Sequence, residues 1–281
     1  MKYETRYCAF VDILGFSGLI QQLKSDAISF ERLHDLLKVV HARPTEYQAD
    51  PFASSDLRAQ SISDAVCLST ACSEVGLSHL IYSLDQLTGR LLEVGYFVRG
   101  AIVKGRLFHD EEVVFGEALV SAYKLETEVA RYPRIMIERD VAMDIQKYYS
   151  SHSHQTTWSL LEFQFFFCLM QGSDGPYFLN TLRDFEFKFD DAKDENQLER
   201  SNHIDKCNRI AEKIQTRFSK SVDTPRHFEK VQWFARYWNN YIAKRNDKLR
   251  KISGPGLGPD PSFEPLWLFL RDSGDQKLVS S

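Results

Sequence analysis

The sequence lacks the features that mark secreted, membrane-spanning and disulfide-stabilised proteins. Its five cysteines include no C-x-x-C pair, and an odd number of them fits reduced thiols better than a disulfide framework or a zinc site. The longest apolar stretch, near 163–170, is far shorter than the ~20 residues that cross a bilayer. The N-terminal segment MKYETRYCAF is too polar for a signal peptide. We therefore expect a soluble, cytoplasmic protein without membrane association.

Charge of either sign is not in excess. The chain has 35 basic and 39 acidic residues, a formal charge of −4, so no general field favours nucleic acid, and any polyanion site must be local. Hydrophobic residues make up 43% and aromatic residues 13%, which is typical of a globular chain. A length of 281 residues allows one large domain, or a domain with an extension, around a sizeable core.

Hydrophobic periodicity divides the chain into a mixed part and a helical part. Strand-like segments are expected at 7–11, 61–69, 97–103, 113–115, 134–138, 158–170 and 177–179. Helices are expected after Ser29, over 77–92 with Gly95 as the C′ residue, from Gly116 to before Pro133, and over 141–149. A polar loop is expected at 45–59, and another loop around His109. Two further helices are expected after residue 190. The expected organisation is an α+β domain at 1–182, a helical extension at 183–252 and an irregular tail at 253–281.

Two aspartates stand out because each interrupts an apolar strand-like segment. Asp12 lies in the sequence FVDILGF, and Asp64 lies in SISDAV. A buried carboxylate needs a hydrogen-bond partner, a cation or an exposed strand end. A turn or cap explains either aspartate alone. The two together favour a shared metal site, because carboxylate oxygens suit Mg²⁺ or Mn²⁺ and a two-metal site can clamp a triphosphate.

Two further segments combine glycine with charged residues. In FVRGAIVKG, Arg99 lies inside a strand before Gly100, which is unfavourable in a strand unless an anion approaches the backbone and the guanidinium. In VFGEALVSAYKLE, Gly116 leads from a strand into a helix, whose N–H groups could bind phosphate. The alternative for this segment is an ordinary strand–helix turn with a solvated Lys124.

Taken in order, these segments resemble the catalytic domain of class III nucleotidyl cyclases. The family pattern F-x-D-I-x-G-F is matched by Phe10, Asp12, Ile13, Gly15 and Phe16. Asp64 stands where the family has its second metal-binding aspartate. The patterns R-x-G-I-x-x-G and W-G-x-x-V-N-x-A-x-R-x-E are approximated from Arg99 to Gly105 and from Phe115 to Glu126. The resemblance covers about residues 3–140, and extends to 182 through the last hairpin.

The resemblance implies a ferredoxin-like core, an antiparallel sheet with flanking helices, and a homodimer with its sites at the interface. It implies two divalent ions, Mn²⁺ or Mg²⁺, held by Asp12, Asp64 and the backbone carbonyl of Ile13. Arg99 would bind the terminal phosphates. Lys124, contributed by the other subunit, would stabilise the charge that develops on the α-phosphate.

The departures from the family pattern concern the nucleobase. Gln60 and Val113 occupy the two positions at which the family selects a purine by charge, and Gln60 suits an amide-like base edge. Lys124 replaces an arginine and lacks its bidentate fork. Phe16 is a further substrate-binding candidate. Tyr47, in the polar loop, either narrows the base pocket or is an ordinary surface residue.

These fragments look most similar to the bacterial pyrimidine cyclases of the Pycsar antiphage system. That resemblance implies cyclisation of UTP or CTP, with UTP favoured, and a separate effector that senses the product. Three alternatives remain open: a purine cyclase that selects its base by pocket shape, a GGDEF-type relative, and an inactive cyclase-like module that senses nucleotides or dimerises. The presence of both aspartates disfavours the inactive module, and no G-G-D/E-E-F sequence occurs.

Overall fold

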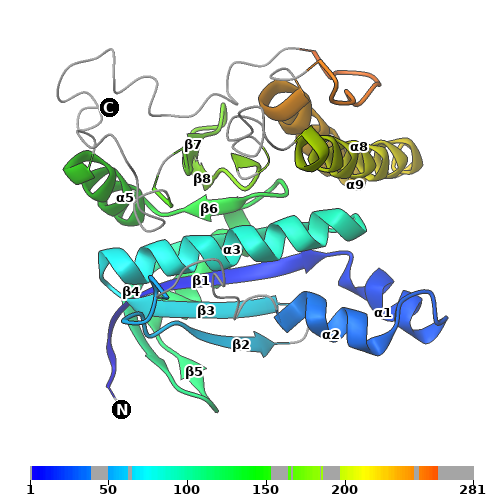
Figure 1. The fold of residues 1–281 in the computed structure, drawn as a ribbon. Helices are drawn as coiled ribbons and strands as arrows, with labels where there is room; N and C mark the ends of the chain where they lie inside the picture. The colour runs from blue at the N-terminus through cyan, green and yellow to red at the C-terminus, as the bar shows by residue number, and fades with distance from the viewer. Residues whose placement is uncertain are drawn as a thin grey trace.

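The computed structural model describes residues 2–38, 50–62, 65–152, 164–165, 167–183, 185, 197–243 and 247–258. In these ranges the chain forms a twisted sheet with helices packed on it (Figure 1). The strands are β1 (Glu4–Leu14), β2 (Arg58–Ile62), β3 (Ala65–Ala71), β4 (Phe97–His109), β5 (Val114–Phe115), β6 (Ile135–Ile137), β7 (Leu169–Gln171) and β8 (Tyr177–Leu179). The helices are α1 (Phe16–Lys24), α2 (Phe30–Lys38), α3 (Glu74–Val94), α4 (Glu117–Lys124), α5 (Arg139–His152), α8 (Gln197–Lys220) and α9 (Pro225–Tyr237). Two π-helical segments follow α4 and α9, namely η2 (Leu125–Val129) and η3 (Trp238–Ala243).

The described strands are ordered β2-β3-β1-β4-β6-β8-β7, with β5 paired to β4 beside this path. Strand β1 is central and runs antiparallel to both β3 and β4. Among the described pairs, only β4 and β6 are parallel. The expected α+β class, with a mostly antiparallel sheet and flanking helices, is therefore confirmed.

One face of the sheet packs on α3. Alternate residues of β1, among them Val11 and Ile13, are buried in the cluster that includes the apolar side of α3, as the period of two in a strand requires. The N-terminus of α3 is capped by Ser73, whose side chain accepts a hydrogen bond from the N–H of Gly76. Gly95 ends the helix in the left-handed conformation at φ 88°, which confirms it as the C′ residue.

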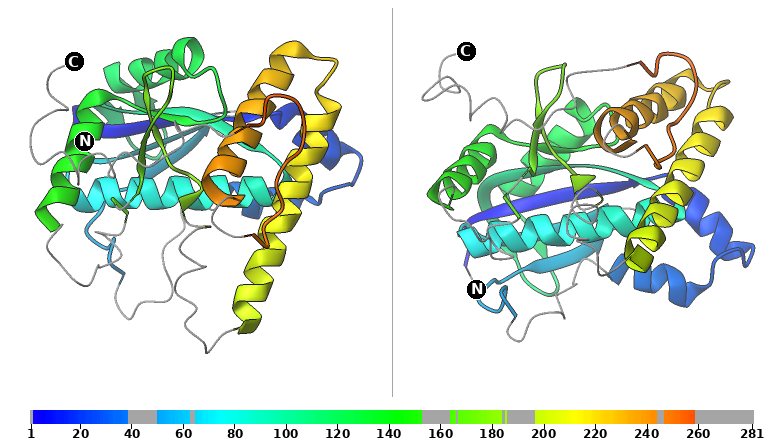
Figure 2. Two further views of the ribbon diagram at one scale, coloured as in Figure 1. Left: turned by 90° about the horizontal axis from the view of Figure 1, so that it is seen from above. Right: turned by 45° about the horizontal axis from the view of Figure 1, so that its top comes forward.

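Two groups of helices cover different parts of the opposite face. Ala118 and Ala122 of α4 pack on Cys8 and Val103. Farther along the same face, the ring of Phe234 on α9 lies 4.6 Å from the ring of Phe97. Figure 2 shows α8 and α9, coloured yellow to orange, packed together beside the end of the sheet where β1 leads into α1. The α4–η2 segment and α9 therefore cover neighbouring parts of the sheet, where the end of β1 pairs with the start of β4.

Two expectations about strands were wrong. The single strand expected over 61–69 is two antiparallel strands, because β2 ends at Ile62, β3 begins at Ala65, and these two residues pair. Asp64 therefore follows the end of one strand instead of interrupting an apolar one, and its own placement lies outside the described residues. His109 does not lie in a loop. It ends β4 and pairs with Val114 of β5.

The later elements agree with the sequence pattern in part: among the described residues, the strand expected over 158–170 is reduced to β7, and residues 164–165 and 167 lie in turns. Strands β7 and β8 form the expected antiparallel pair across residues 172–175. Helices α8 and α9 account for the two helices expected after residue 190, and their apolar faces share a cluster with Phe97 and Phe178 of the sheet. No described helix has the length and apolar character of a membrane span.

Candidate functional site

Asp12 and Arg99 lie side by side on neighbouring strands. They are direct partners in the antiparallel pairing of β1 with β4, so their side chains project from the same face of the sheet. An Oδ2 atom of Asp12 lies 3.6 Å from Nη2 of Arg99, and the side chains are 21% and 19% exposed. Strand register thus joins two motifs that are far apart in the sequence.

Glu126 is the second acidic partner of Arg99. Its side chain forms an ion pair with the same Nη2 atom and is only 2% exposed. Burial raises the pKa of the Glu126 carboxyl above its usual range, against the opposing effect of the Arg99 guanidinium. The cation of Arg99 is therefore held between a buried carboxylate and a partly exposed one.

The backbone after α4 directs Glu126 inward. Residues Leu125–Val129 form a π-helical turn, closed by a hydrogen bond from the N–H of Ala130 to the carbonyl oxygen of Leu125. Such turns are frequent at functional sites. Glu126 also continues the buried positions of Ala118 and Ala122 at a spacing of four residues. The sequence analysis gave Glu126 no role, although an acid on the apolar stripe of a helix requires a nearby cation.

Gly100 has a packing explanation that the sequence analysis missed. A Cβ atom at this position would lie 2.6 Å from the backbone oxygen of Phe10 and 2.9 Å from a methyl group of Val11. The glycine next to Arg99 therefore permits close approach of β1 and β4. An anion near the backbone is not needed to account for it.

Lys230 of α9 is a further charge near this cluster that the sequence analysis did not single out. Its ammonium group interacts electrostatically with Asp12, Arg99 and Glu126. Nothing local in the sequence links a helix of the C-terminal extension to the first strand, and only the packing of α9 on the sheet reveals it. The candidate site therefore includes a part of the chain beyond residue 182.

Three other expected site residues lie around this cluster without joining it. Ile13 is 2% exposed and its side chain lies on the α3 side of the sheet, so only its backbone could face the site. Phe16, at the start of α1, packs against that same core. Lys124 is exposed at the end of α4. It lies two residues before Glu126, and positions two apart on a helix point in different directions.

Gln60 and Val113 come together at the opposite side of β1. The Gln60 amide donates a hydrogen bond to the backbone oxygen of Glu112 at 3.0 Å, next to Val113, whose side chain is 48% exposed. Within one chain the strand of Gln60 is separated from the strand of Arg99 by β3 and β1. Tyr47 and Asp64 lie outside the described residues.

The described acids supply part of a metal site at most. No group of three or more His, Cys, Asp or Glu side chains suited to a metal ion occurs in the described ranges. Asp12 contributes a partly exposed carboxylate at the end of β1. Its partner on the other side is Ala65, the residue that follows Asp64 in the chain. The carboxylate of Asp12 therefore fits some, but not all, of the oxygen ligands that a Mg²⁺ or Mn²⁺ site needs.

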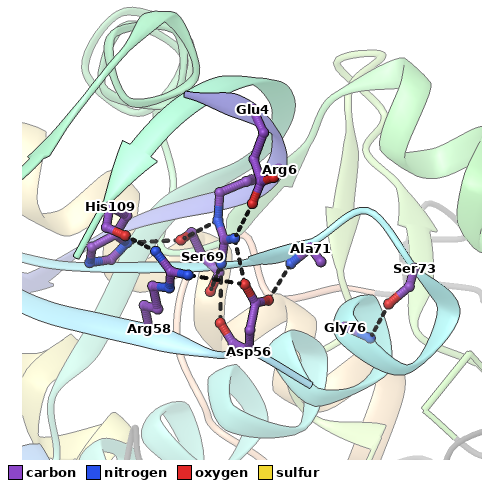
Figure 3. A network of polar contacts seen from close by, with 9 residues as sticks. All are labelled: Glu4, Arg6, Asp56, Arg58, Ser69, Ala71, Ser73, Gly76 and His109. Atoms are coloured by element: carbon purple, nitrogen blue, oxygen red, sulfur yellow. Dashed lines mark hydrogen bonds and ion pairs between the residues drawn. The ribbon is translucent and has the colours of Figure 1, made fainter. Parts of the chain in front are cut away.

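A second polar cluster lies nearer the start of β1 and is closed (Figure 3). Arg6, 1% exposed, bonds to Asp56 through Nη1 at 2.6 Å and to Ser69 through Nε at 3.1 Å. Ser69 in turn lies 2.8 Å from Nδ1 of His109. Burial, together with the nearby cations of Arg6 and Arg58, lowers the pKa of His109 to about 4. The central residues are inaccessible, so this cluster is structural and is not a second candidate site.

Comparisons with known proteins give distant likenesses. No protein-family model and no curated protein matches the chain. Among solved structures, the catalytic core of a rhodopsin-guanylyl cyclase with converted specificity, in complex with ATPαS, is 13% identical with a TM-score of 0.36, over 63% of this chain and 95% of that one. A bacterial light-regulated adenylyl cyclase is 12% identical with a TM-score of 0.35, over 64% of this chain and 53% of that one. Values this low do not assign the chain to a family.

Proposed function

We propose that the protein is a metal-dependent nucleotidyl cyclase that converts UTP to cyclic UMP and pyrophosphate. The observation that carries the proposal is the pairing of Asp12 with Arg99 at 3.6 Å on one face of the sheet. It brings together a candidate metal-binding acid and a candidate phosphate-binding base from two cyclase-like motifs. Both side chains are partly exposed, as a substrate site requires.

Asp12, the backbone carbonyl of Ile13 and Asp64 would hold the two divalent ions. Carboxylate and carbonyl oxygens are the ligands that Mg²⁺ and Mn²⁺ prefer. When bound, the ions would neutralise the triphosphate and lower the pKa of the ribose 3′-hydroxyl.

Arg99 would position the terminal phosphates. Its Nη2 atom is held by Glu126 and Asp12, while its buried Nε has no hydrogen-bond partner among the described residues. A guanidinium fixed at one end and unsatisfied at the other is suited to a phosphate oxygen. In the reaction, the 3′-hydroxyl would lose its proton to solvent and its oxygen would bond to the α-phosphorus, while the bond from the α-phosphorus to the α,β-bridging oxygen breaks and pyrophosphate leaves. The protein contributes mainly position and charge to such a step.

A second copy of the chain would supply Lys124, Gln60 and Val113 to the site. The support is a set of exposed apolar residues in and next to β5 and α4, namely Val113, Phe115, Val120 and Tyr123, each 48–54% exposed. Clustered exposed apolar side chains of this kind mark interfaces. Lys124 lies on the same helix, so docking through this surface would carry it to the partner's Asp12 and Arg99.

The dimer can be tested with two matched substitutions of equally exposed apolar residues. Val120→Glu places a charge on the proposed interface, and Met143→Glu places one on α5 at the same exposure of 52%. We expect light scattering to show a dimer for the unmodified chain and Met143→Glu, and a monomer for Val120→Glu. Equal mass for both variants would contradict this interface.

The base assignment rests on Gln60, an amide where a charged selector would favour purines. UTP is favoured over CTP, with a purine triphosphate as the remaining enzymatic alternative. We propose that the cyclic product acts in antiphage defence through a separate effector protein that senses it.

The deciding experiment is an assay of the full chain with Mn²⁺ and each of the four ribonucleoside triphosphates, with products separated by chromatography. We expect cyclic UMP and pyrophosphate in equal amounts, and none when EDTA removes the metal. A cyclic purine product would correct the base assignment. Nucleotide binding without any cyclic product would instead favour a sensing or dimerisation module.

A further inference from the structure

Basic side chains from the C-terminal helices converge on the end of β1. Arg217 of α8 places its guanidinium over the rings of Tyr96 and Phe97, 4.8 Å and 5.2 Å from their centroids. A Cβ atom on Gly15 would lie 3.4 Å from Nη2 of Arg217. Gly15 follows Asp12 by three residues, so this guanidinium borders the turn that continues from the candidate metal-binding acid.

Lys230 approaches the same place from α9. Its helix is fixed on the sheet by the contact of Phe234 with Phe97, whose ring centroids are 4.6 Å apart. Lys230 precedes Phe234 by four residues and so lies on the same side of the helix, about 6 Å away. Arg99 follows Phe97 by two residues and so lies on the same face of the strand, about 7 Å away. The contact of Phe234 with Phe97 and these two spacings together direct Lys230 towards Arg99.

Among the described residues, the two C-terminal cations are not held in salt bridges. In the ranges that the structure describes, neither Arg217 nor Lys230 forms a salt bridge, whereas Arg99 is shared by Asp12 and Glu126. Burial and the nearby Arg99 cation lower the pKa of Lys230, against the opposing effect of the Asp12 and Glu126 carboxylates. Burial also lowers the pKa of Arg217. A half-buried cation that has no salt bridge of its own can gain a charge-assisted hydrogen bond from an anion that binds beside it.

We propose that Lys230 and Arg217 form, with Arg99, the binding site for the terminal phosphates of the nucleotide, so that the C-terminal helices supply the phosphate-binding part of the site from the same chain as Arg99. This inference rests on the proposed function for the identity of the ligand, a nucleoside triphosphate. It gives the α8–α9 extension a role in substrate binding. Lys230 would contact a phosphate oxygen directly. Arg217, whose guanidinium lies beside the turn at Gly15, would contact another.

The test is calorimetric titration of inorganic tripolyphosphate into the full chain, in EDTA so that only protein cations contribute. We expect measurable binding that weakens about tenfold in Lys230→Gln and in Arg217→Gln, since each substitution removes one charge-assisted contact. Lys230→Arg should stay within about threefold of the unmodified chain, because it keeps the charge. Lys220→Gln, on an exposed residue of α8, should bind as the unmodified chain does. Absence of binding to the unmodified chain, or equal binding by all variants, would overturn the inference.

A parallel nucleotide assay separates this inference from the proposed function. If the chain cyclises UTP, we expect Lys230→Gln to raise KM about tenfold with a smaller change in kcat, because the contact exists before the reaction begins. If the chain cyclises UTP, and both Lys230→Gln and Arg217→Gln leave KM and tripolyphosphate binding unchanged, the inference is overturned and the proposed function stands. Weakened tripolyphosphate binding in a chain that cyclises no nucleotide would retain the anion site and refute the cyclase. Circular dichroism of each variant checks that it is folded.

Discussion

Two charged clusters lie on the same face of β1, six residues apart, and they differ in how completely their charges are satisfied. Around Arg6, each guanidinium nitrogen has a hydrogen-bond partner and the side chain is 1% exposed (Figure 3). Around Arg99, the side chain is 19% exposed and Nε has no partner in the described part of the chain. The guanidinium of Arg6 is therefore satisfied by its neighbours, whereas the guanidinium of Arg99 retains the capacity to bind a ligand.

The difference teaches how to separate a structural charge from a functional one. A buried arginine with a full set of partners stabilises the fold, because removing any partner leaves a charge without compensation. A partly exposed arginine with an unsatisfied nitrogen, beside a partly exposed acid, contributes less to stability and remains available for binding. Substitutions in the two clusters should therefore affect different measurements.

The largest expected effect is on activity. Asp12→Asn removes a candidate metal-binding charge, so kcat/KM for the nucleotide should fall at least about 10³-fold, roughly 4 kcal/mol of transition-state stabilisation. Its urea midpoint should change little. Glu4→Gln, on the same strand and at the edge of the Arg6 cluster, is the control and should retain full activity. An active Asp12→Asn would refute the metal assignment.

The next effect is on stability. Arg6→Ala leaves Asp56 and Ser69 without their buried partner and should reduce the free energy of unfolding by about 3 kcal/mol, the lower end of the range because Asp56 is 38% exposed. Arg58→Ala removes a 41% exposed partner of the same carboxylate and should cost less than about 1 kcal/mol. Urea denaturation measures both, and equal losses would contradict the view that burial separates them.

Acid should weaken the closed cluster through His109. Its pKa in the folded protein is lowered to about 4 by burial and by the Arg6 and Arg58 cations, so the unfolded chain takes up the proton first as the pH falls. The contribution is present above about pH 6.5 and is lost towards pH 4, amounting to about 2 kcal/mol between pH 7 and pH 5. Urea denaturation of His109→Gln across this range should show a shallower loss, and parallel curves for the two proteins would count against a neutral His109.

The smallest effect concerns the orientation of Arg99. Glu126→Gln keeps the shape of the side chain but removes the charge that fixes the guanidinium, so kcat should fall about tenfold, near 1.4 kcal/mol. KM should not rise, because a negative charge near the phosphates is also lost. Steady-state kinetics with Glu128→Gln, an exposed acid on the same turn, supply the control. A rise in KM at constant kcat would refute the orienting role.

Much of the secondary structure could be predicted from local pattern. Helix α3 follows from its apolar stripe and from Gly95, and the two helices after residue 190 follow from their spacing of apolar residues. The exceptions have long-range causes. His109 belongs to a strand because Val114 pairs with it, and 61–69 divides into β2 and β3 because Ile62 and Ala65 pair with each other.

The candidate site was only partly visible in the sequence. Asp12 and Arg99 stand out because each places a charge among strand residues, and their position in cyclase-like motifs suggested a common site. Glu126 carried a local signal, an acid in line with buried alanines. Lys230 and Arg217 carried none, since an amphipathic helix normally has basic residues on its surface.

The sequence by itself determined the periodicity of the elements, the balanced total charge and the two motif residues of the site. Tertiary structure alone decided which charges meet. Arg6 meets Asp56, and Arg99 meets Asp12 and Glu126. Lys230 lies close enough to Arg99 and its two acidic partners to interact with them. The physical reason is that periodicity depends on neighbours within a few residues. The partner of a charge depends instead on strand register and helix packing between segments far apart in the chain, and the energy of that charge depends on how deeply the packing buries it.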